Sequence, residues 1–237
     1  MMKPVLIVLA ATILTITVGM VLMMVSSEDR QVITAPTPTP IPLEQVAQAA
    51  QVDLNYLIRH IQPLAQDYGF ADEQEVTDIT LGYPYQLYNI NYDQAKNYTP
   101  NLSAEYMLIP EQRWGFPILL DGEAKGMADL ATEDGELQFV RFSSNARVAQ
   151  NLVDFQAKHD RAGERGPIKL LRISPLHTNF ALTQYDGQSQ VTLLTEAAPG
   201  RERLFLTSLD ESQTYELKEV VPQIAEDIKE LEQKYDN

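Results

Sequence analysis

Residues 4–25 form an unbroken run of 22 uncharged, mostly aliphatic residues behind a single cation, Lys3. A helix rises about 1.5 Å per residue, so this run would be about 33 Å long and match a hydrocarbon core of about 30 Å. The apolar core of a cleavable signal peptide is shorter, with about 7 to 15 residues. The run therefore predicts one transmembrane helix at residues 4–25 that acts as a signal anchor.

Cleavage of this segment is the open alternative, because Val25-Ser26-Ser27 offers small residues that a signal peptidase accepts. Positive residues tend to stay on the cytoplasmic side of a membrane helix. Lys3 therefore predicts a cytoplasmic N-terminus at residues 1–3. We expect a single-pass membrane protein with its C-terminal domain outside the cytoplasm, or a secreted protein if the segment is cleaved.

A linker rich in proline and threonine follows at residues 26–42. Four prolines lie within residues 36–42. Proline fixes φ and removes a backbone donor, so neither a helix nor a sheet is expected there. A membrane anchor followed by such a linker indicates that residues 43–237 form a tethered domain outside the cytoplasm.

The composition of the chain excludes several classes of function. The chain has no cysteine, which rules out disulfides, thiolate metal sites and cysteine nucleophiles. Its formal net charge is −15, and it has no cluster of lysines and arginines. Nucleic acid is therefore not expected as a partner, because binding it requires clustered cations that displace counterions.

Three stretches of the domain have apolar residues at helical spacing. The first runs over residues 43–68 and is expected to split near Gln62, because Pro63 cannot continue a helix. The second spans residues 148–159 and is expected to end at Gly163. The third covers the C-terminus, where Pro222 places the helix start close to Glu219.

Strands are expected between these helices, since apolar and polar residues alternate there. The expected strands are residues 86–92, 104–109, 116–121, 126–132, 136–143, 168–173, 179–185, 190–195 and 203–207. Asp-Gly pairs at Asp121, Asp134 and Asp186 predict tight hairpins. The fold class is therefore α+β, with antiparallel sheets and packed helices.

Helix followed by antiparallel strands occurs twice, at residues 43–143 and 144–237. The two halves are either a duplication or two α+β units that are alike by chance. The sequence leaves both alternatives open.

Aromatic residues are concentrated in one part of the domain. The candidate binding residues are Tyr83, Tyr85, Tyr88, Tyr92 and Trp114. Exposed aromatic side chains on a rigid sheet are common in binding surfaces, since tyrosine combines apolar area with a polar tip. The alternative is ordinary packing, because strands favour aromatic residues.

Catalytic, metal and cofactor motifs are absent from the sequence. The three histidines, His60, His159 and His177, are not spaced for a local metal site. No serine lies in a G-x-S-x-G context. We therefore expect no cofactor, no metal and no catalytic residue that the sequence can name.

Two segments carry a strand-entry pattern and a hairpin pattern. They are Leu81-Gly82-Tyr83-Pro84-Tyr85, and residues 114–122 with the sequence W-G-F-P-I-L-L-D-G. In these patterns the chain resembles uncharacterised exported bacterial proteins with a G-x-P-[YF] strand entry and a W-x-F-P-hydrophobic-D-G hairpin. The resemblance implies export. The patterns reflect turn and strand geometry, and no functional residue follows from them.

These features predict a membrane-anchored, non-enzymatic module that binds a protein, a peptide or an envelope component. One alternative is an extracytoplasmic hydrolase that uses carboxylates, with His177 and neighbouring acids in a cleft between the halves. A second alternative, an inhibitor or propeptide-like module, rests on analogy with small helix-plus-sheet folds.

Overall fold

The computed structural model of the chain describes residues 41–163, 166–195, 209–210 and 212–235, all within one compact unit that begins at Ile41. The predicted transmembrane helix, the cytoplasmic N-terminus, most of the linker and the predicted strand at residues 203–207 lie outside these residues. Within the described ranges, no helix is both long enough and apolar enough to cross a membrane.

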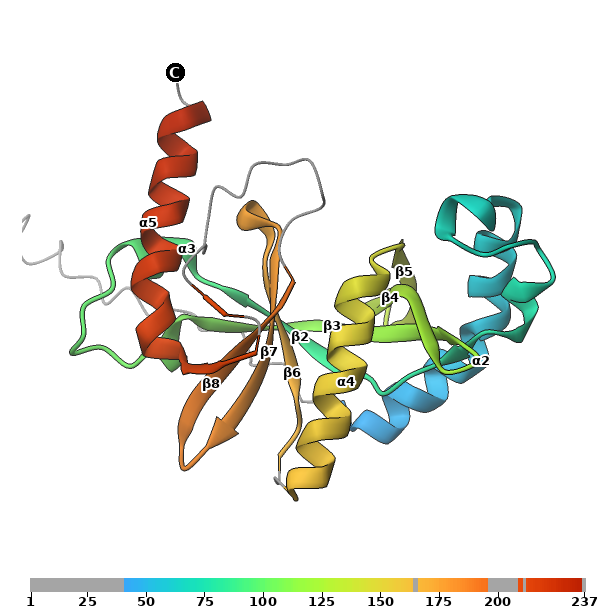
Figure 1. Cartoon of the computed structure of the whole chain (residues 1–237), viewed down its shortest axis with the longest axis horizontal. Helices are drawn as coiled ribbons and strands as arrows, with labels where there is room; N and C mark the ends of the chain where they lie inside the picture. Colours follow the sequence, from blue (N-terminus) through green and yellow to red (C-terminus); the bar gives the residue numbers. More distant parts are fainter. Residues whose placement is uncertain (1–40, 164–165, 196–208, 211, 236–237) are drawn as a thin grey trace, which may run out of the picture. The chain divides into compact units, whose positions relative to one another are not determined.

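The unit has a mixed α+β fold built on one large sheet with four helices (Figure 1). Its strands are β1 (Thr80–Leu81), β2 (Tyr85–Ile90), β3 (Leu108–Leu120), β4 (Glu123–Glu133), β5 (Glu136–Ser143), β6 (Lys169–Ile173), β7 (Thr178–Tyr185), β8 (Gln188–Thr195) and β9 (Thr214–Glu216). The strand order is β5-β4-β3-β2-β6-β7-β8-β9, and β1 also pairs with β3. The predicted α+β class is confirmed.

The sheet consists of two antiparallel meanders placed side by side. Strands β2 to β5 form the first meander, and strands β6 to β9 form the second. The two meanders meet at β2 and β6, which pair in parallel. A parallel pair needs a crossover connection, and helix α4 (Ala146–Ala162) lies in the chain between the two meanders. The duplication and the chance similarity of the two halves both stay open as interpretations.

The three predicted Asp-Gly hairpins are present. Positive φ angles occur at Asp121 and Gly122 (52° and 84°), at Asp134 and Gly135 (51° and 85°), and at Asp186 and Gly187 (49° and 79°). Positive φ at both central residues is the mark of the type I′ turn, whose twist matches that of the flanking strands. Local chemistry therefore determines where these strands reverse.

The helices begin and end close to the predicted positions. Helix α2 (Leu43–Ile61) stops before Pro63, and two 3₁₀ turns, η1 (Gln62–Leu64) and η2 (Gln66–Tyr68), follow it. Helix α4 ends at Gly163 with φ at 68°, and at its start the side chain of Asn145 accepts a hydrogen bond from Val148 N at 3.2 Å. Helix α5 (Leu217–Tyr235) begins two residues before Glu219.

Two local predictions were wrong or incomplete. Residues 104–107 form a 3₁₀ turn, η4 (Ala104–Met107), and β3 begins only at Leu108. The predicted strand at residues 86–92 ends at Ile90, because Asn91 caps a short helix, α3 (Tyr92–Lys96). The 3₁₀ turns η3 (Glu75–Asp78) and η5 (Ser174–Leu176) carried no clear signal in the sequence.

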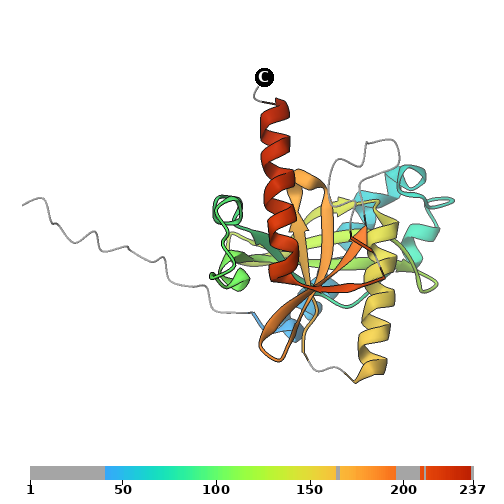
Figure 2. The ribbon, with the colours of Figure 1, turned by 60° about the vertical axis from the view of Figure 1, so that its left-hand side comes forward.

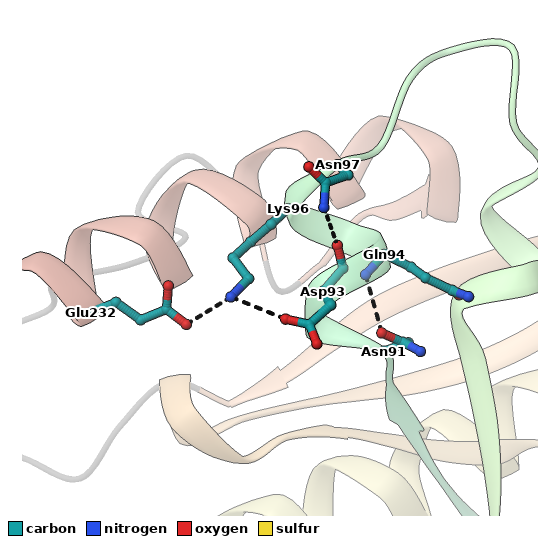
Figure 3. Close-up of polar contacts among 6 residues, drawn as sticks. All are labelled: Asn91, Asp93, Gln94, Lys96, Asn97 and Glu232. Carbon is teal, nitrogen blue, oxygen red and sulfur yellow. Dashed lines mark hydrogen bonds and ion pairs between the residues drawn. The ribbon is translucent and has the colours of Figure 1, made fainter. Parts of the chain in front are cut away.

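An ion pair at the surface joins helix α3 to α5, and a second lies within α3 (Figure 3). Lys96 Nζ lies 2.9 Å from Glu232 Oε1 and 3.3 Å from Asp93 Oδ1. The Asn91 side chain accepts a hydrogen bond from Gln94 N at 3.1 Å, which caps α3. These ion pairs raise the pKa of Lys96 above its ordinary value through hydrogen bonds to Glu232 and Asp93.

Helices cover both faces of the sheet. α2 packs on the first meander, and α5 packs on the second with α3 (Figure 1). The core under α4 contains residues of both meanders: Tyr85, Leu87, Ala124, Met127, Leu170, Ala181 and Leu194. Because side chains alternate along a strand, these residues lie on the face opposite α2 and α5. α4 therefore joins the two halves through one shared core, while the far end of α5 projects beyond the sheet (Figure 2).

Gly126 lies where β4 approaches β5 too closely for a side chain. A Cβ atom added at Gly126 would lie 2.4 Å from the backbone oxygen of Ser143. We therefore expect Gly126→Ala to reduce the free energy of unfolding by about 1–3 kcal/mol, measured by urea denaturation, because a backbone atom cannot move aside locally. Gly115→Ala is the matched control, since its Cβ would meet the flexible end of Met127 at 3.0 Å. A larger loss for Gly115→Ala would contradict this explanation.

Candidate functional site

The structure distributes the five predicted aromatic residues over both faces of the sheet. Tyr85 is 1% exposed and belongs to the core under α4, whereas Trp114 is 3% exposed and belongs to the core under α2. Tyr83 is 45% exposed and meets Tyr85 edge-on, with ring centroids 5.5 Å apart. The five rings therefore do not form one exposed surface.

The two remaining tyrosines are half-buried and make specific contacts. The ammonium of Lys169 lies 4.8 Å from the ring centroid of Tyr88. The hydroxyl of Tyr92 donates a hydrogen bond to Asn89 Oδ1 at 2.8 Å. The proposed binding role of these aromatic residues stays a prediction, and Tyr83 is the most accessible of them.

The hydroxyl of Tyr85 makes stability sensitive to alkaline pH. Burial, followed by the nearby Tyr83 and Asp160, raises the pKa of Tyr85 above its ordinary value. A raised pKa in the folded state stabilises the fold below the unfolded pKa of about 10, and this stabilisation is lost as the pH rises above that value.

We expect Tyr85→Phe to remove this contribution. The wild-type free energy of unfolding should fall above pH 10 by up to about 1.4 kcal/mol per pH unit from this one group. Urea denaturation between pH 8 and 11 measures the slope. Tyr185→Phe, at an exposed position, is the control and should keep the alkaline fall. An unchanged slope in Tyr85→Phe would refute the assignment.

The three histidines differ in their exposure to solvent. His60 and His177 are exposed, and His177 adopts a positive φ of 51° after η5. His159 is buried on α4, where its ring stacks on Phe155 with centroids 6.2 Å apart. Its Nε2 atom lies 3.3 Å from Gly166 O. His159 also lines a cavity, described next.

That cavity, called here the α4–sheet cavity, lies between the C-terminal half of α4 and strands β7, β8 and β9. Its volume is about 620 Å³. The strands contribute Thr183, Gln190, Thr192, Leu193, Leu194 and Thr214, Ser212 comes from the residues before β9, and α4 contributes Asn151, Asp154, Phe155, Lys158, His159 and Ala162. The volume falls within the usual range for small-ligand sites, about 300–1,000 Å³.

Most side chains on the strand side of the α4–sheet cavity are polar. The hydroxyls of Thr192 and Thr214 lie 2.8 Å apart and share one hydrogen bond. Because each hydroxyl has one donor and two acceptor positions, this pair retains one donor and several acceptor positions. Within the described part of the chain, the side chains of Thr183 and Gln190 have no hydrogen-bond partner. The cavity therefore offers both donors and acceptors to a ligand.

The helix side of the cavity carries its charges. Asp154 and Lys158 are exposed residues one turn apart on α4. Gln150 Nε2 donates to Asp154 Oδ1 at 3.0 Å, while Lys158 has no ion-pair partner among the described residues. Asn151 Nδ2 donates to the carbonyl of Leu194, which joins α4 to β8 at one end of the cavity.

A second, smaller cavity of about 270 Å³ contains two carboxylates, Glu105 and Glu216. Burial alone would raise the pKa of Glu105. Hydrogen bonds from Ser103 and Ser189 together lower it by more, so the pKa lies below its ordinary value. The backbone N–H of Ser189 donates to Glu105 Oε1 at 3.0 Å. A carboxylate that acts as a general acid needs the opposite shift. The lowered pKa therefore favours the ionised form of Glu105, which accepts these hydrogen bonds.

A buried ion pair links the two halves on the α4 face. Asp129 on β4 is 2% exposed, and Arg172 on β6 donates to it from both terminal nitrogens, at 2.9 and 3.3 Å. Both residues lie on the face of their core neighbours two positions away, Met127 and Leu170. Because both carboxylate oxygens of Asp129 accept hydrogen bonds from Arg172, we interpret the pair as a structural contact that joins the two meanders.

Comparison of the chain with protein-family models, with curated proteins and with solved structures finds no match. Among the described residues, no group of three histidine or acidic side chains is placed to hold a metal ion. No motif in the sequence predicts the α4–sheet cavity. The alternation of Gln190, Thr192 and Leu194 indicates that these residues share one face of β8. It does not show that α4 packs next to this face.

Proposed function

We propose that the chain is a single-pass membrane protein that displays residues 43–237 outside the cytoplasm as a non-enzymatic binding module. In this proposal residues 4–25 anchor the chain, residues 26–42 act as the linker, and the α4–sheet cavity holds the ligand. The ligand belongs to a protein, a peptide or another component of the cell envelope. If the anchor is cleaved, the same module is secreted.

The observation that carries this proposal is the α4–sheet cavity itself. Its volume of about 620 Å³ suits a small ligand or part of a larger one. Thr183 and Gln190 bring hydrogen-bonding groups that have no partner among the described residues. These groups are open to the cavity, so a ligand can hydrogen-bond to them without breaking a contact inside the protein.

The carboxylate hydrolase is less well supported. Hydrolysis of this kind requires two carboxylates on either side of the scissile bond, one of them with a raised pKa. Among the described residues that line it, the α4–sheet cavity contains one carboxylate, Asp154. The smaller cavity contains two, but the pKa of Glu105 is lowered. His177, which the alternative places in a cleft, lines neither cavity.

Site-specific photo-crosslinking in cells tests the proposal. A photoreactive residue replaces Lys158 at the rim of the cavity in the full-length chain, and a control chain carries it at Val52, which is 79% exposed on α2. We expect a crosslinked product of defined mass at position 158 that is absent or much weaker at position 52. Equal products at both positions, or none at position 158, would refute a binding role for the cavity.

A further inference from the structure

We infer that the ligand of the α4–sheet cavity is a neutral, hydroxyl-rich compound of the saccharide class. This inference rests on the proposed function and specifies the chemistry of its ligand. Three observations lead to it: the backbone of β8 at the cavity is already paired, most of the strand side chains that line the cavity are neutral and polar, and the charges on α4 are balanced.

The backbone of β8 leaves little room for an added peptide strand. Its residues Gln190 to Thr192 already pair with β7 on one side and with β9 on the other. Further along β8, the carbonyl of Leu194 accepts a hydrogen bond from Asn151 of α4. Recognition of an extended peptide by strand addition depends on a free row of backbone groups. Along this part of β8, a ligand is therefore recognised mainly by side chains.

Those side chains match the hydrogen bonding of sugar hydroxyls. Thr183, Thr192 and Thr214 present hydroxyls, and Gln190 presents an amide with both donors and an acceptor. Each hydroxyl of a sugar is likewise both a donor and an acceptor, so every group can find a complementary partner. Phe155 adds apolar ring area at the opposite wall, where the C–H face of a sugar ring can pack.

The charges of the cavity argue against an anionic ligand. Lys158 is the cavity's one lysine or arginine among the described lining residues, and Asp154 on the same helix carries the opposite charge. Phosphate and carboxylate ligands are usually held by several cations, often by the fork of an arginine. The balance of Asp154 and Lys158 therefore favours a neutral ligand.

Saturation-transfer NMR on the full-length chain in detergent micelles tests this inference. The probes are the neutral trisaccharides chitotriose, cellotriose and maltotriose, and trialanine serves as the peptide probe. We expect at least one trisaccharide to bind at millimolar concentration and trialanine not to bind. The variant Thr183→Val/Gln190→Leu should weaken trisaccharide binding about tenfold, because it removes two hydrogen-bonding groups without changing the shape of the cavity much.

The control variant is Gln184→Leu, which changes a neighbouring exposed glutamine of β7 that does not line the cavity. It should bind the trisaccharide like the wild type. Binding of trialanine that depends on Gln190 would overturn the saccharide inference and keep the cavity as the ligand site. If no probe binds, or if trisaccharide binding is unchanged in Thr183→Val/Gln190→Leu, the saccharide inference is wrong. The crosslinking at position 158 then decides separately whether the cavity binds anything.

Discussion

Replacement of Asp129 by asparagine should reduce the free energy of unfolding of the Ile41–Asn237 unit by about 3 kcal/mol. Asparagine keeps the size of the side chain but removes the charge that both terminal nitrogens of Arg172 contact. The guanidinium would then remain largely buried without its counterion, and this is the costly part of breaking a buried pair. Urea denaturation followed by circular dichroism measures the loss.

The double variant Asp129→Leu/Arg172→Met separates this cause from general damage to the core. Replacing both partners of a buried ion pair by apolar residues is often close to neutral, since no unpaired charge is left behind. We therefore expect the double variant to recover most of the stability that Asp129→Asn loses. If the double variant were as unstable as Asp129→Asn, the unpaired charge of Arg172 would not be the cause of the lost stability.

Lys96→Met is the surface control for the same argument. Lys96 also contacts two carboxylates, but these lie at the surface between α3 and α5 (Figure 3). Exposed ion pairs are screened by water and restrict long side chains, so they contribute little. Lys96→Met should leave the urea midpoint nearly unchanged. A loss as large as that of Asp129→Asn would contradict the distinction between the two pairs.

Leu152→Ala should destabilise the unit by about 2–5 kcal/mol. Leu152 is fully buried on α4, in the core that contains residues of both meanders. The substitution removes apolar contacts and leaves a cavity that a sheet on one side and a helix on the other cannot easily fill. Because α4 also forms one wall of the α4–sheet cavity, ligand binding should weaken together with stability.

Val52→Ala on α2 is the matched control. Val52 is 79% exposed, so its truncation removes few contacts, and alanine is the better helix former. We expect its urea midpoint to equal or slightly exceed that of the wild type. If Leu152→Ala and Val52→Ala had similar stabilities, the assignment of α4 as the shared core helix of both halves would be wrong.

Much of the fold could be predicted because its signals are local. The type I′ turns follow from Asp-Gly pairs, which tolerate positive φ, and Pro63 ends α2 because it cannot donate a backbone hydrogen bond. The alternation over residues 86–92 predicts a strand that includes Tyr92. The side chain of Asn91 caps a helix there instead, and this local signal outweighs the alternation.

The aromatic group shows why the site was harder to predict. Tyr85 pairs directly with Gly115 of β3, and paired residues of a sheet share a face. Trp114 precedes Gly115 by one residue and therefore points to the opposite face. The sequence contains both strands but not their register, and a register one residue away would have placed Tyr85 and Trp114 on the same face.

By itself, the sequence determined the α+β class, the three hairpins and the ends of the main helices, because each depends on residues close together in the chain. The tertiary structure alone decided the parallel pairing of β2 with β6, the contact of Asp129 with Arg172 and the α4–sheet cavity. These features join residues far apart in the chain, and their arrangement follows from how the apolar faces of two meanders pack against one helix. Periodicity reveals that such faces exist, but only packing selects which of them meet.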